Sequence, residues 1–155
     1  QRAGTQVFLC AGALVGIDAL AAARHVGLAQ VRYERRAPPA TWIRSGALGA
    51  EQSTAAESFE VFSGSAREAA LRFPKNANVA ATIALAGVGS EATRVVLVAD
   101  PAHTGNTHTI HAEGAFGELR AQISARTLSA TSTSSMIVAG SLARAVLARE
   151  DRIVV

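Results

Sequence analysis

The chain has 155 residues, of which 49% are hydrophobic and only 5% aromatic, and its formal net charge is +3. A single cysteine, Cys10, excludes an internal disulfide and a metal cage of several cysteines, while the lack of an apolar run of about 18 residues argues against a membrane span. The basic residues are scattered, which disfavours nucleic-acid binding although the pI is about 10. We therefore expect one globular domain with a cytoplasmic location.

The first part of the chain alternates strand and helix signals. Residues 6–10, which are apolar from Val7 onward, predict a short buried strand. Small residues at 11–16 then predict a turn into a helix that ends at Gly27. Residues 29–35 alternate as a strand with one solvent-facing side, which ends at a pair of prolines. The segment 40–53 predicts a loop.

Two helix starts follow, each marked by a capping residue. After a short strand at 59–62, Ser65 and Glu68 have the spacing of a capping box. Asn78 stands at the N-cap position of an Ala-rich helix. Residues 87–92 spell G-x-G-x-x-A, but they follow a helix rather than a strand. They therefore predict a helix terminator and not a dinucleotide-binding fingerprint.

Strand signals dominate the second part. Residues 93–99, 108–113 and 118–125 are consecutive strand signals with short turns, which predict an antiparallel meander. Polar residues at 131–135 introduce a long final helix, and residues 152–155 predict a last strand. Because strand and helix signals mix without strict alternation, the expected fold class is α+β, with an open mixed, largely antiparallel sheet and helices on one face.

Three of the four histidines fall in one polar loop and strand, at positions 103, 108 and 111. Imidazole titrates near neutral pH, so proton transfer is the chemistry that this stretch suggests. Side chains alternate on a strand, which places His108 and His111 on opposite faces and argues against a shared metal ion. We expect no metal site, but a single acting imidazole whose tautomer is fixed by Asp100 or a backbone carbonyl.

Several segments resemble the L-aspartate dehydrogenase family, in the family's order and over nearly the whole chain. They are A-G-A-L-V-G-I-D-A-L at 11–20, F-P-K-N-A-N-V-A-A-T at 73–82, A-D-P at 99–101, N-T-H-T-I at 106–110, G-A-F-G at 114–117 and T-S-S-M at 133–136. Members of this family are two-domain enzymes that use NAD or NADP, and the chain resembles only their second half. The resemblance implies that residues 1–155 form the catalytic and dimerisation domain, that the amino-terminal Rossmann domain is absent from this sequence, and that two copies pair through the sheet.

The resemblance also implies roles for individual residues. His108 matches the active-site histidine of the family, and Ala13 and Asn78 match positions that meet the nicotinamide cofactor. We expect His108 at a strand edge, in a cleft shared with the Ala13 turn and the start of the Asn78 helix. Lys75 and Asn106 are candidate residues for binding the substrate, L-aspartate. The implied reaction yields iminoaspartate, which water converts to oxaloacetate and ammonia or which passes to NAD biosynthesis.

Two other hypotheses stay open. The chain could belong to a related two-domain dehydrogenase, such as homoserine dehydrogenase or dihydrodipicolinate reductase, although the N-T-H motif at 106–108 argues against these. It could also be an assembly domain that pairs through its sheet and catalyses nothing. Measuring NAD binding by this chain alone separates the second hypothesis from an enzyme that carries a complete site.

Overall fold

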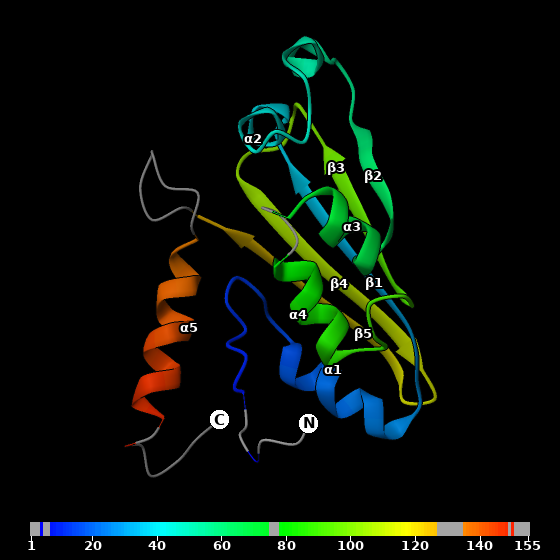
Figure 1. The fold of residues 1–155 in the computed structure, drawn as a ribbon, viewed down its shortest axis with the longest axis vertical. Helices are drawn as coiled ribbons and strands as arrows, with labels where there is room; N and C mark the ends of the chain where they lie inside the picture. Colours follow the sequence, from blue (N-terminus) through cyan, green and yellow to red (C-terminus); the bar gives the residue numbers. More distant parts are fainter. Residues whose placement is uncertain (1–3, 5–6, 75–77, 127–134, 149, 151–155) are drawn as a thin grey trace.

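The computed structural model describes residues 4, 7–74, 78–126, 135–148 and 150. A single five-stranded sheet with the strand order β2-β3-β1-β4-β5 forms its centre (Figure 1). The strands are β1 (Leu28–Ala37), β2 (Phe59–Ser65), β3 (Thr93–Ala99), β4 (Asn106–Gly114) and β5 (Gly117–Ala125).

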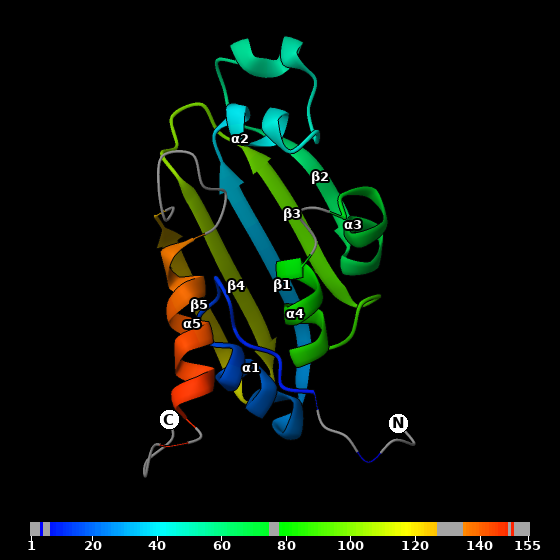
Figure 2. The same cartoon turned by 60° about the vertical axis from the view of Figure 1, so that its left-hand side comes forward.

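The longer helices all lie on one side of this sheet, as Figures 1 and 2 show. They are α1 (Ile17–Ala23), α3 (Ala66–Arg72), α4 (Asn78–Ala86) and α5 (Met136–Leu147). The short helix α2 (Pro39–Arg44) lies at the end of the sheet where β1 ends, and single 3-10 turns follow α1 (Arg24–Val26) and precede β2 (Ala50–Thr54). The expected α+β class, a mixed sheet with helices on one face, is confirmed.

The order of the strands differs from the predicted meander. β4 and β5 form the expected antiparallel hairpin, but β1 lies between β3 and β4, parallel to β3 and antiparallel to β4. As the central strand, β1 is paired along nearly its whole length on both sides. Turn signals report only local pairing, so they could not indicate this insertion.

The core lies between the sheet and the helices. Alternate residues of the central strands point into it, and the helices cover them with aliphatic side chains. The largest fully buried side chains are Trp42, Tyr33, Leu20, Ile83, Ile110 and Val95. Because the chain has few aromatic residues, the single tryptophan and the single tyrosine provide much of the buried volume in this layer.

Two predicted elements are wrong. Residues 7–10 form no strand, and Val7 and Phe8 are 82% and 73% exposed, because no strand of the described chain pairs with this segment. Within the segment 40–53, the structure has α2 and a 3-10 turn in place of a loop. Pro39 starts α2 because its fixed φ suits the first turn of a helix. The predicted strand at 152–155 lies outside the described residues.

The predicted helix boundaries are confirmed at the start of α3 and at the ends of two other helical segments. The Ser65 hydroxyl accepts a hydrogen bond from the Glu68 N–H at 3.1 Å, and the Glu68 carboxylate accepts one from the Ser65 N–H at 2.7 Å. Gly27 ends the first helical segment with a left-handed φ of 84°. α4 ends at Ala86, so the 87–92 motif is a helix terminator, as predicted.

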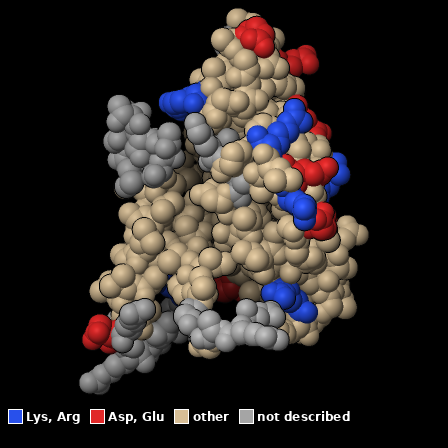
Figure 3. Space-filling model, in the orientation of Figure 1, with Lys and Arg blue, Asp and Glu red and all other residues tan. Residues whose placement is uncertain are grey.

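The last described helix, α5, is an exposed element. None of the side chains of α5 is buried. The surface that α5 forms on the left of Figure 3 is nearly free of charged side chains. Its exposed large apolar residues are Met136, Ile137, Leu142, Val146 and Leu147. Of the helices in the described part of the chain, not one combines the length and the hydropathy that crossing a membrane requires.

Candidate functional site

His108 lies on β4 with its ring directed to the helix-covered side of the sheet. β4 is an interior strand, paired with β1 on one side and β5 on the other, so the expected position at a sheet edge is wrong. The residue is only 6% exposed. Its backbone neighbour on β1 is Arg35, and its neighbour on β5 is Ile123. The imidazole is therefore a nearly enclosed polar group within the sheet's inner layer.

The direct partner of this ring is a tyrosine. The hydroxyl of Tyr33 on β1 lies 2.8 Å from Nδ1 of His108, and the two rings are nearly parallel, at 5°. Tyr33 is fully buried. The expectation that Asp100 or a backbone carbonyl fixes the tautomer is wrong, because Tyr33 occupies that position. Nε2 of His108 has no hydrogen-bond partner among the described residues.

A half-buried cation completes the immediate surroundings. Arg35 follows Tyr33 on the same face of β1, and its guanidinium donates to Oδ1 of Asn106 at 2.9 Å. The same guanidinium stacks 4.7 Å from the ring centre of Trp42, whose indole N–H donates to the carbonyl oxygens of Ala37 and Val98. Trp42 thus anchors α2 to the ends of two strands through its indole N–H. Its ring also holds the Arg35 guanidinium by a cation–π contact.

Burial controls the ionisation of this group of side chains. Burial, together with the smaller effect of the nearby Arg35 charge, lowers the pKa of His108 to about 4. Burial also raises the pKa of Tyr33 above its usual range, against a smaller opposing effect of Arg35, and lowers the pKa of Arg35. At neutral pH the site holds a neutral imidazole, a protonated phenol and a guanidinium cation.

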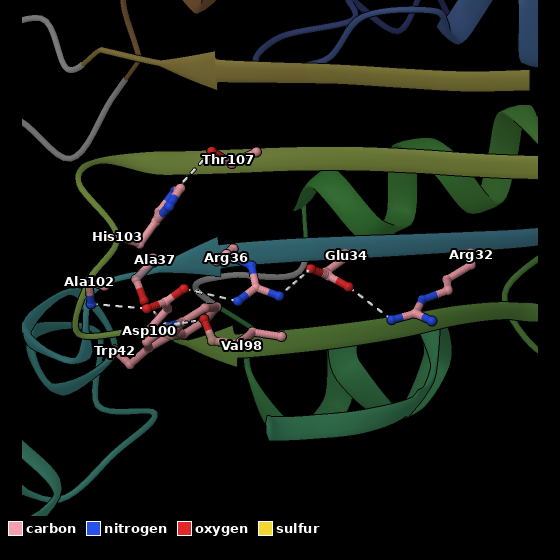
Figure 4. A network of polar contacts seen from close by, with 10 residues as sticks. All are labelled: Arg32, Glu34, Arg36, Ala37, Trp42, Val98, Asp100, Ala102, His103 and Thr107. Carbon is pink, nitrogen blue, oxygen red and sulfur yellow. Dashed lines mark hydrogen bonds and ion pairs between the residues drawn. The ribbon is translucent and has the colours of Figure 1, made fainter. Parts of the chain in front are cut away.

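The other histidines have separate partners. On the opposite face of β4, His111 hydrogen-bonds Glu118 at 2.7 Å, which confirms the predicted alternation. His103 contacts Thr107 at 2.9 Å (Figure 4). No three histidine, cysteine, aspartate or glutamate side chains of the described residues gather as a metal site would require.

Asp100 belongs to a charged row on the uncovered face of the sheet, drawn in Figure 4. Arg32 pairs with Glu34 at 2.9 Å, Glu34 with Arg36 at 3.0 Å, and Arg36 with Asp100 at 3.0 Å. The hydrogen bond from Arg36 holds the pKa of Asp100 below its usual value. The row lies on the face opposite to His108, since residues 32, 34 and 36 alternate with Tyr33 and Arg35.

The structure brings only part of the predicted site into direct contact. Asn106 is two residues before His108, on the same face, and accepts a hydrogen bond from Arg35, which is the register partner of His108. Ala13 lies in a turn that is held at one end by a hydrogen bond from the Gly12 N–H to the Ser141 hydroxyl at 3.0 Å.

Asn78 and Lys75 complete the predicted set. Asn78 is exposed at the start of α4, where its Oδ1 accepts from the N–H of Val79. The Asn78 helix and the Ala13 turn lie on the His108 side of the sheet (Figure 2), but no hydrogen bond or ring contact of the described residues joins either residue to His108. Lys75 lies outside the described residues.

Comparison with known proteins agrees with the resemblance noted from the sequence. Residues 18–149 match the family model described as "Aspartate dehydrogenase, C-terminal". The chain belongs to this family. It is 51% identical over 147 residues to L-aspartate dehydrogenase 1 of Bordetella parapertussis, covering 94% of this chain and 54% of that protein. It is 42% identical to L-aspartate dehydrogenase of Pseudomonas aeruginosa over the same length, with 94% and 55% covered.

A solved structure agrees with both the family and the fold. The crystal structure of aspartate dehydrogenase from Thermotoga maritima superposes with a TM-score of 0.77 at 33% identity, covering 97% of this chain and 56% of that one. The chain thus spans about half the length of the relatives that it matches.

Sequence reasoning missed Tyr33, Arg35 and Trp42 as parts of the site. Alternation did place Tyr33 and Arg35 on one face of their strand, but Tyr33 and His108 are separated by 75 positions. A signal was present in the composition: the chain has only one tyrosine and one tryptophan. A buried tyrosine or tryptophan in a core otherwise built of small aliphatic residues needs a hydrogen-bond partner for its O–H or N–H. These two residues therefore indicated where buried polar groups would lie.

Proposed function

We propose that the protein carrying this chain is an L-aspartate dehydrogenase that uses NAD or NADP. L-aspartate gives up a hydride from its α-carbon, and the resulting iminoaspartate takes up water to give oxaloacetate and ammonia, or passes to NAD biosynthesis. The proposal is supported by membership of the aspartate dehydrogenase C-terminal family together with a nearly enclosed, neutral histidine next to a cation. The match of residues 18–149 to the aspartate dehydrogenase C-terminal family is the observation that carries it.

The proposed role of His108 is that of the catalytic residue. Its Nε2 contacts the substrate, where it exchanges a proton with the amine or activates the water that attacks the imine. Nδ1 is already engaged by Tyr33, so Nε2 is the nitrogen left for the substrate. Asn106 and Lys75 are proposed to bind the substrate. For Asn106 the support is its hydrogen bond to Arg35, which holds the amide on the His108 side.

The proposed cofactor contacts are Ala13 and Asn78. The turn around Ala13 is open, since a side chain built on Gly12 would meet only the carbonyl oxygen of Cys10, at 4.0 Å. The exposed amide of Asn78 offers a donor at the start of α4. A flat nicotinamide ring fits next to groups of this size, and when bound it supplies the hydride acceptor. The task of the chain's own residues is to orient the substrate and to manage its protons.

The test compares two histidine variants of the protein that carries this chain. His108→Ala is expected to lower the turnover of L-aspartate by about 100-fold or more, because it removes a proton-exchanging group, with little change in cofactor affinity. His111→Ala serves as the matched control, since His111 lies on the other face of the same strand, and it should keep normal turnover. Parallel assays with homoserine test the related dehydrogenase class. Unchanged turnover in His108→Ala would contradict the proposal.

We propose in addition that two copies associate through the sheet. In support, the described helices leave one sheet face uncovered (Figure 2), and this face carries the charged row Arg32, Glu34, Arg36 and Asp100. Alternating charges of this kind can pair with a second copy in antiparallel register. Sedimentation velocity should show a dimer that Glu34→Arg weakens. A monomer at all concentrations would contradict this association.

A further inference from the structure

Tyr33 and His108 form a diagonal pair on one face of two neighbouring strands. The direct register partner of Tyr33 on β4 is Ile110, two residues after His108. The Tyr33 hydroxyl lies 2.8 Å from Nδ1, and both side chains are enclosed, at 0% and 6% exposure. The ring centres are 6.1 Å apart with nearly parallel planes. Packing therefore fixes both rings, and the hydrogen bond between them is the polar contact that decides how the imidazole is presented.

The number of hydrogens available at this contact indicates which group donates the hydrogen bond. A neutral imidazole has one N–H and one lone pair, whereas a phenol hydroxyl can donate one hydrogen and accept others. If Nδ1 carried the hydrogen and donated it, the Tyr33 hydroxyl hydrogen would need another acceptor. His108 is the only hydrogen-bond partner of this hydroxyl among the described residues. Tyr33 is 0% exposed, so its hydroxyl hydrogen would be buried without an acceptor, whereas His108 is 6% exposed and its Nε2 is not one of the buried polar atoms that lack a partner. A buried donor without an acceptor is unfavourable, so the Tyr33 hydroxyl donates to Nδ1.

We propose that Tyr33 is a positioning residue for His108: its hydroxyl donates to Nδ1, which places the ring hydrogen on Nε2 and holds Nε2 as the atom that meets the substrate. In this resting form His108 presents a hydrogen-bond donor. The other neutral tautomer, with its single hydrogen on Nδ1 and a lone pair on Nε2, is the form that accepts a proton at Nε2, and in it the Tyr33 hydroxyl accepts from Nδ1–H. Tyr33 thus partners both forms and favours the first.

Burial of the pair agrees with this assignment. Both groups stay uncharged at neutral pH, because burial lowers the pKa of His108 to about 4 and raises that of Tyr33. A neutral ring has a defined tautomer, whereas a doubly protonated ring has none. The importance of the pair for turnover rests on the proposed function, but the direction of the hydrogen bond does not.

The first experiment reads the tautomer directly by nitrogen-15 NMR of the histidine rings in the 155-residue chain. In the native chain, His108 should be protonated at Nε2, with its Nδ1 resonance in the range of a hydrogen-bonded lone pair. In Tyr33→Phe, which keeps the buried ring, Nδ1 should move to the range of a nitrogen without a donor. The ring signals of His25 and His111 should stay unchanged and serve as internal controls.

A native His108 protonated at Nδ1, or an Nδ1 resonance that does not move in Tyr33→Phe, overturns the proposal. The native measurement decides even if the variant does not fold.

The second experiment separates this proposal from the proposed function. In the protein carrying this chain, Tyr33→Phe should lower kcat about tenfold or more with less than about a twofold change in KM. Combined with His108→Ala, the same change should have no further effect, because Tyr33 acts through His108. Unchanged kcat in Tyr33→Phe, or an equal loss in both backgrounds, overturns the positioning role. If His108→Ala keeps full turnover, the catalytic role of His108 fails, while the NMR result still decides the direction of the hydrogen bond.

Discussion

Arg35 and His108 lie directly opposite each other on the neighbouring strands β1 and β4. A permanent cation is therefore built into the sheet next to a buried imidazole. The arrangement makes a second positive charge on the ring unfavourable, and burial acts in the same direction. Together these two effects keep the imidazole neutral, which is the state in which it can exchange a proton.

The two effects can be separated by removing the cation. In Arg35→Met the pKa of His108 should rise above its native value of about 4, because the neighbouring charge is lost. It should remain below 6.5, because burial is the larger cause and persists. Titration of the His108 ring protons by NMR measures this. Arg32→Met, on the opposite face of the same strand, is the matched control and should leave the titration unchanged. A pKa that returns fully to 6.5 would show that the charge and not burial dominates.

The same pKa predicts acid sensitivity of the fold. The unfolded chain binds a proton at His108 near pH 6.5, whereas the folded chain binds it only near pH 4. The contribution is therefore fully present above pH 6.5 and is lost as the pH falls toward 4, by about 3 kcal/mol at most. Urea unfolding of the native chain and of His108→Gln at several pH values measures this difference. The stability of His108→Gln should fall less over this range, and parallel pH profiles would contradict the assignment.

Substitutions of Trp42 test its two interactions, the indole N–H bonds to backbone carbonyls and the cation–π contact with Arg35. Trp42→Phe keeps an aromatic ring under the guanidinium but removes the N–H that donates to the carbonyls of Ala37 and Val98. We expect a loss of about 1–3 kcal/mol in the free energy of unfolding, because both carbonyls lose the indole donor, although the Ala37 carbonyl keeps the hydrogen bond from the Asp100 N–H. Trp42→Leu also removes the aromatic face and should cost more. Equal stability of the native chain and Trp42→Phe in chemical denaturation would exclude a structural role for the indole N–H.

A pair of glycine substitutions tests the close approach between the start of β1 and the end of β4. A Cβ at Gly114 would collide with the carbonyl oxygen of Gly27, which is backbone and cannot rotate away. Gly114→Ala should therefore lower the free energy of unfolding by about 2 kcal/mol or more. Gly140→Ala, inside α5, meets nothing within 4 Å and should be neutral or stabilising by up to about 1 kcal/mol. A neutral Gly114→Ala would show that the two strands separate easily at this point.

Local chemistry in the sequence was sufficient for the parts of the fold that depend on neighbouring residues. The Ser65 and Glu68 capping box, the Gly27 helix end and the β4–β5 hairpin are all decided within a few positions, and each was predicted. The motifs around His108 were also sufficient to indicate the family. Alternation along β4 separated His108 from His111, because side chains on a strand point to opposite faces in turn.

Only the tertiary structure decided which strands are neighbours, and with that the environment of His108. The insertion of β1 between β3 and β4 brought Tyr33 and Arg35 to the imidazole. The physical reason is that strand pairing is a long-range choice, made by burying whole apolar faces together and not by any local signal. Residue types and their order therefore determined the candidate histidine, whereas its tautomer, charge and partners follow from contacts between segments far apart in the chain.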